Sequence, residues 1–152
     1  MKITEKFLKE KDACSEGIEY VIANKYIGLE RKAFLEKLIA EDKLDWANWL
    51  IVRTMKYKQY VSYAVFAAEQ VIDIYEKKYS NKNAPRKAIE AAKLCIQAPT
   101  KQNKAAAAAY AAAAYAAAAY AAAYAAYAAA AYNNAVRKEI KIKILNYGLS
   151  LL

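Results

Sequence analysis

The stretch "AAAAAYAAAAYAAAAYAAAYAAYAAAAY", residues 105–132, holds 22 alanines, 6 tyrosines and nothing else. Alanine is the strongest helix former because it loses no side-chain entropy on folding. No glycine or proline follows until Gly148, so the pattern predicts a long helix, and whether it stays continuous through Asn133 and Asn134 is left open. We expect Thr100 to cap this helix, since its hydroxyl can accept a first-turn amide.

Three environments could hold such a helix. A membrane span would need the Leu, Ile, Phe or Val that drive insertion, and the tract has none of them. A disordered segment would be rich in Pro, Ser, Gly or charge, which the tract also lacks. We therefore predict an inner helix of a soluble bundle, since an uncharged helix of this length needs partners on most sides.

Tyrosine is unevenly spread around the predicted helix. At about 100° per residue, five of the six tyrosines fall within roughly 140° of arc, with Tyr115 nearly opposite. The remaining surface is almost bare alanine, which lets a neighbouring helix approach closely. A homodimer seam along this alanine face and a monomer with the helix at its centre explain the composition equally well.

The rest of the chain predicts an all-α, single-domain bundle spanning residues 1–152, with about six or seven helices around the alanine–tyrosine helix. Glycine and proline number only 3 and 2, too few for a strand-rich fold with frequent turns. Helical apolar spacing marks the segments 4–17, 17–26, 29–43, 45–55, 58–79, 83–97 and 136–152. Pro85 suits a first helical turn and Gly148 suits a helix stop.

Composition argues against most catalytic chemistry. The chain has no histidine, no glycine-rich phosphate loop and no paired-cysteine motif. We therefore predict no enzyme activity, no cofactor and no metal site. No apolar leader is visible in the first residues, so we expect a cytoplasmic protein in which Cys14 and Cys95 are buried free thiols.

The order of several segments resembles a known family. "ACSEGIEYV" is followed by "DWANWL", by "YAVFAAEQVIDIYEKKYSNKNAPRKAIEAAKLCI" and then by the alanine-rich helix. This order is similar to the immunity proteins of bacterial polymorphic-toxin systems, the immunity-five-like family, which includes phage-encoded members. The positions that carry the resemblance are Ala67, Glu69, Tyr75, Glu76, Tyr79, Pro85, Arg86, Ala88, Ile89 and Glu90.

The resemblance implies an all-helical protein that binds a protein toxin or a host defence effector. The chain departs from the family at Ser80, where proline is common, and at Ala84, where arginine is common. The family's alanine helix also carries arginines and tryptophans, which tyrosines replace here. Partner choice therefore need not follow the family.

Two groups of residues could carry chemistry. Glu69, Asp73 and Glu76 lie at i, i+4 and i+7, so that one helix could present three carboxylates on one side. The simpler interpretation is a charged helix face, with Glu76 and Arg86 as a structural ion pair. The second group is basic and aromatic, which suits phosphates and bases, and its candidate binding residues are Arg53, Lys56, Tyr57, Tyr60, Arg86, Lys87, Tyr120, Tyr124 and Tyr127.

Three functions follow as hypotheses. The first is an immunity or inhibitor protein, and the net charge of +9 then favours a neutral or acidic target. The second is a phage anti-defence module that sequesters an acidic, nucleotide-type small molecule in a polar pocket. The third is an enzyme that uses the three carboxylates. We expect no membrane partner in any of the three.

Overall fold

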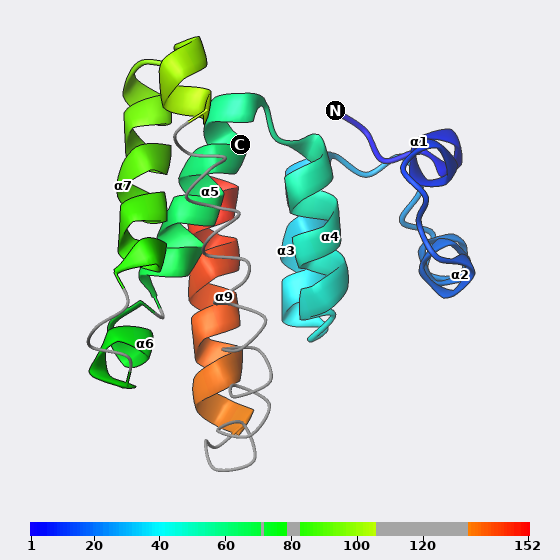
Figure 1. Ribbon diagram of the computed structural model, residues 1–152. Helices are drawn as coiled ribbons and strands as arrows, with labels where there is room; N and C mark the ends of the chain where they lie inside the picture. The colour runs from blue at the N-terminus through cyan, green and yellow to red at the C-terminus, as the bar shows by residue number, and fades with distance from the viewer. Residues whose placement is uncertain (71, 79–82, 106–133) are drawn as a thin grey trace.

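The computed structural model describes residues 1–70, 72–78, 83–105 and 134–152 (Figure 1). Its helices are α1 (Glu5–Glu10), α2 (Ser15–Ala23), α3 (Arg31–Ala40), α4 (Leu44–Thr54), α5 (Tyr57–Glu69), α6 (Ile72–Lys78), α7 (Ala84–Gln97) and α9 (Asn134–Ser150). A further helical stretch covers residues 101–105. The only extended pairing among the described residues is an isolated bridge between Lys2 and Glu30. The predicted all-α, multi-helix class is confirmed.

The predicted alanine–tyrosine helix lies outside the described residues. Its continuity at Asn133 also lies outside them, as does the alanine face on which the homodimer and monomer alternatives depend. The start of the segment is described, and there Thr100 caps the helical stretch as predicted. The amide of Asn103 donates to Thr100 Oγ1 over 3.1 Å. Among the described residues no helix has the length and apolar character needed to cross a membrane.

The helix that joins the parts of the bundle is α9. It packs against α3 and α4 on one side and against α5 on the other, and α7 packs on the far side of α5 (Figure 1). The core around it is built by aliphatic side chains from several elements. Its most deeply buried members include Ile3, Leu35, Leu50, Ile51 and Leu145.

Gly148 does not end a helix, and that prediction is wrong. The helix α9 continues past it to Ser150. A Cβ atom at position 148 would come within 2.5 Å of Ile51 Cδ1 and 2.7 Å of Tyr63 Cε2. The glycine is therefore needed for close approach between α9 and the two helices beside it, and its missing side chain leaves room for theirs.

Three helices end with the same hydrogen-bonded turn although no glycine is present. Asp12, Lys25 and Asp42 follow α1, α2 and α3 with φ values of 56°, 57° and 60°. After α2, for example, the amide of Tyr26 donates to the carbonyl of Val21 over 2.9 Å. The residue with positive φ, Lys25 in this case, closes the helix in a Schellman motif. Glycine usually occupies that position. The turns explain how a glycine-poor chain makes such short connections.

The predicted helix over residues 58–79 is two helices. The first, α5, ends at Glu69, and α6 begins at Ile72. Gln70 caps α5, and its side-chain amide donates to the carbonyl of Phe66 over 3.0 Å. No glycine or proline marks this break. By contrast, Pro85 lies in the first turn of α7 as predicted.

The two cysteines have opposite environments. Cys95 is buried and free, as predicted, but Cys14 is exposed, so the prediction for it is wrong. Cys14 precedes the first turn of α2, and its Sγ accepts the amide of Gly17 over 3.4 Å. The thiol takes the place of the serine or threonine hydroxyl that usually caps a helix.

Candidate functional site

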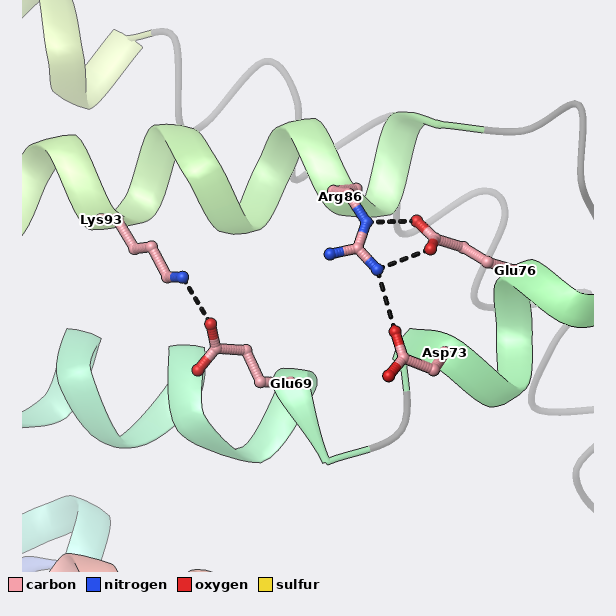
Figure 2. Close-up of polar contacts among 5 residues, drawn as sticks. All are labelled: Glu69, Asp73, Glu76, Arg86 and Lys93. Atoms are coloured by element: carbon pink, nitrogen blue, oxygen red, sulfur yellow. Dashed lines mark hydrogen bonds and ion pairs between the residues drawn. The ribbon is translucent and has the colours of Figure 1, made fainter.

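Two acidic side chains of α6 close on one arginine of α7 (Figure 2). Arg86 Nε donates to Glu76 Oε1 over 2.6 Å, and Arg86 Nη2 donates to Glu76 Oε2 over 2.5 Å. The same Nη2 donates to Asp73 Oδ1 over 3.0 Å. We call these three residues the arginine clamp. The predicted pair of Glu76 and Arg86 is present, and the two-pronged geometry ties α6 to the first turn of α7.

Hydrogen bonding from Arg86 fixes the charge state of the clamp. It holds the pKa of Glu76 below its ordinary value of 4.5, and the same bonds raise the pKa of Arg86. Glu76 is therefore a carboxylate at neutral pH. A general acid or base works best with a pKa near the working pH, so the clamp is better suited to joining two helices than to proton transfer.

The third carboxylate of the predicted group has a different partner. Glu69, at the end of α5, pairs with Lys93 of α7, with 2.5 Å between Oε1 and Nζ (Figure 2). The break between α5 and α6 separates it from Asp73, so the expected single helix face with three carboxylates does not form. Among the described residues, no group of three or more His, Cys, Asp or Glu side chains is arranged to hold a metal ion.

Arg53 is held by its own structural contacts. Its Nε donates to the carbonyl of Lys11 over 3.3 Å, and its Nη1 donates to the carbonyl of Trp49 at the same distance. The guanidinium carbon lies 4.3 Å from the centroid of the Trp49 ring. Arg53 thus anchors α4 to the turn after α1, and we do not count it in a binding surface.

The other basic and aromatic candidates from this region do form a surface. Tyr57 and Tyr60 lie in the first turns of α5. Their side chains are 49% and 48% exposed. The ammonium of Lys104 lies 5.3 Å from the Tyr57 ring centroid. Lys56 is exposed beside them, and Lys101 is exposed one turn before Lys104. We call these five residues the basic tyrosine face.

The basic tyrosine face and the Arg86 region lie at opposite ends of α7. Arg86 and Lys87 are in its first turns, whereas Lys101 and Lys104 follow its C-terminal end. A helix of 14 residues is about 21 Å long. The candidates that the structure describes therefore do not converge into one pocket, and Arg86 is already engaged by two carboxylates.

A polar cleft of about 640 Å³ was not predicted from the sequence. It lies where α2, the turn between α3 and α4, and the first turns of α9 meet, and its walls carry both signs of charge. Lys138 pairs with Asp42 at 2.9 Å and Lys141 pairs with Asp45 at 2.7 Å. Sequence patterns could not reveal the cleft, because 96 positions separate the partners of each pair along the chain and no local motif links them.

The remaining candidates, Tyr120, Tyr124 and Tyr127, lie outside the described residues. No protein-family model matches the chain, and neither the curated proteins nor the solved structures include a match to it. The resemblance to immunity proteins therefore stays a prediction from the residues quoted above.

Proposed function

We propose that the chain is a non-catalytic, cytoplasmic immunity or inhibitor protein that binds a protein toxin or defence effector and neutralises it. The observation that carries this proposal is the basic tyrosine face. Its two tyrosines are half exposed, whereas Tyr63 and Val65 of the same helix are 4% and 7% exposed. Tyrosine is enriched in the centres of protein interfaces, and lysines suit their wetter rims.

The arginine clamp supports a binding role over an enzymatic one. Each carboxylate of the group that could have served as acid and base has a cationic partner, Arg86 or Lys93. A reaction that used these groups would first have to break contacts between α6 and α7 or between α5 and α7. The clamp is therefore best explained as part of the scaffold.

The polar cleft gives less support to the alternative, sequestration of an acidic nucleotide. Its lining includes Lys43, Lys138 and Lys141, but also three carboxylates from Glu16, Asp42 and Asp45. An anionic ligand would have to displace two ion pairs there and tolerate like charges nearby. A site for an acidic small molecule is expected to be more one-sided in charge.

Native mass spectrometry of the protein purified gently from its own host cells tests the proposal. We expect a second protein of defined mass in the complex. That protein, expressed alone, should arrest growth, and co-expression of the chain should relieve the arrest. A small bound mass with nucleotide absorbance, and no second protein, would overturn the proposal in favour of ligand sequestration.

A further inference from the structure

We infer that the basic tyrosine face docks an acidic segment of the protein partner, with carboxylates of that segment pairing with Lys56, Lys101 and Lys104. This inference rests on the proposed function and adds the chemistry of the partner. It starts from how charge is distributed along the chain. No Asp or Glu lies between Asp45 and Glu69, or between Glu90 and Glu139.

The two acid-free stretches meet at one end of the α5–α7 pair. One stretch supplies Lys56 and the two tyrosines, and the other supplies Lys101 and Lys104. The contact between Lys104 and the Tyr57 ring brings them together. None of the three lysines pairs with a carboxylate among the described residues, whereas Lys93, Lys138 and Lys141 all do. The face is thus a positive patch that lacks internal compensation within the described structure.

The side chain of Gln59 holds this end of α5 in place. Its Oε1 accepts the backbone amide of Lys56 over 2.9 Å. Its Nε2 donates to the carbonyl of Leu151, in the segment after α9. The first turn of α5 is therefore fastened to the C-terminal segment, so its lysine and tyrosines are presented from a fixed backbone, which lowers the entropy lost on binding.

Several features favour a protein segment over a nucleic acid. Arginine binds phosphates through bidentate hydrogen bonds. Arg53, the nearest arginine in sequence, is already engaged by two backbone carbonyls and the Trp49 ring. Single strands bind by stacking successive bases on open aromatic rings, yet one face of Tyr57 is already approached by Lys104. Exposed ammonium groups beside half-exposed tyrosines instead match carboxylates on a protein surface.

Fluorescence anisotropy with two labelled probes tests the inference on the full-length chain. The probes are a peptide of alternating Glu and Leu and an oligothymidylate of the same net charge. The face variant is Lys56→Gln/Lys104→Gln, and the control variant is Lys32→Gln/Lys143→Gln, which removes the same charge from exposed lysines elsewhere. We expect the face variant to bind the peptide about tenfold more weakly, and the control to bind it as the unmodified chain does.

Three results would overturn the inference. Equal weakening in both variants would show that the attraction follows overall charge and not this face. Tighter binding of the oligothymidylate, lost in the face variant, would make the surface a nucleic-acid site. The probes need no effector, so these results are independent of the co-purification test. If the chain relieves growth arrest but the face variant does so equally well, the proposed function stands and the docking inference fails.

Discussion

Gly148 of α9 lies so close to Ile51 of α4 that a Cβ atom at position 148 would come within 2.5 Å of Ile51 Cδ1. Ile51 is fully buried, and Tyr63, the second neighbour, is 4% exposed. A Cβ atom at position 148 would therefore force buried core side chains to shift. The contact sets how closely α9 approaches α4 and α5.

Gly148→Ala should destabilise the protein, although alanine is the better helix former. The added methyl group should cost about 3 kcal/mol by overpacking and regain about 1 kcal/mol of helix propensity. We therefore expect the free energy of unfolding, measured with urea, to fall by about 2 kcal/mol. Gly17→Ala is the control, because the tight neighbour there is only the exposed Cys14 sulfur at 3.2 Å. A stabilised Gly148→Ala protein would contradict the packing described.

Tyr63 should make the protein sensitive to alkali. Burial raises the pKa of its hydroxyl to about 12, above the value of about 10 expected in the unfolded chain. The neutral phenol thus favours the fold below pH 10, and this contribution is lost as pH rises towards 12. Relative to Tyr63→Phe, the unmodified protein should lose stability across that range, as measured by urea unfolding at a series of pH values.

The hydroxyl of Tyr63 donates to Asn48 Oδ1 over 2.7 Å, so Asn48→Ala is the matched control. It removes the hydrogen-bond partner but keeps the titrating group, and the exposed position tolerates alanine. Its alkaline loss should parallel that of the unmodified chain. If Tyr63→Phe showed the same loss, other groups would be responsible for it.

The arginine clamp should be visible in the titration of one carboxyl group. The ¹³C carboxyl shift of Glu76 should titrate with a midpoint below 4.5, because Arg86 stabilises the charged form. A lowered pKa contributes stability above pH 4.5 that disappears as pH falls through the folded-state value. In Arg86→Gln the midpoint should return towards 4.5, and in Lys93→Gln it should stay low. An unchanged midpoint in Arg86→Gln would rule out the clamp.

The two thiols should react at very different rates. Cys14 is exposed, whereas Cys95 is 1% exposed. A chromogenic disulfide reagent should modify one thiol promptly in the native protein and the second only after unfolding. Cys14→Ser should abolish the fast phase and Cys95→Ser the slow one. Two fast thiols in the native protein would mean that Cys95 is not packed against its neighbours as described.

The sequence predicted most helices because their signals are local. Apolar spacing placed α3 and α4, and first-turn chemistry identified the positions of Pro85 and Thr100. These features depend on residues within one or two turns of each other. The pairing of Glu76 with Arg86 was also predictable, since only a short connection separates the two helices.

The misses arose where tertiary contacts decide the outcome. Glycine usually ends a helix, yet at position 148 the close approach of Ile51 and Tyr63 makes it necessary inside α9. The break after Glu69 has no glycine or proline to announce it. Lys56, Tyr57 and Tyr60 of the basic tyrosine face were candidates from one short stretch of sequence, but no local motif joins them to Lys101 and Lys104. The polar cleft has no local motif that unites its members, so its assembly could not be predicted from spacing alone.

The most direct test of non-catalytic binding is a stoichiometric titration of the effector's activity with the purified chain. We predict that the effector's residual activity falls linearly with added chain and reaches its minimum at the molar ratio of the complex. Each molecule of a tight binder neutralises only the partner it holds. The folded variant Glu69→Gln/Asp73→Asn/Glu76→Gln should give the same end point. Loss of effector activity at far below one equivalent, increasing with time and abolished in this folded variant, would show turnover and contradict the proposed function.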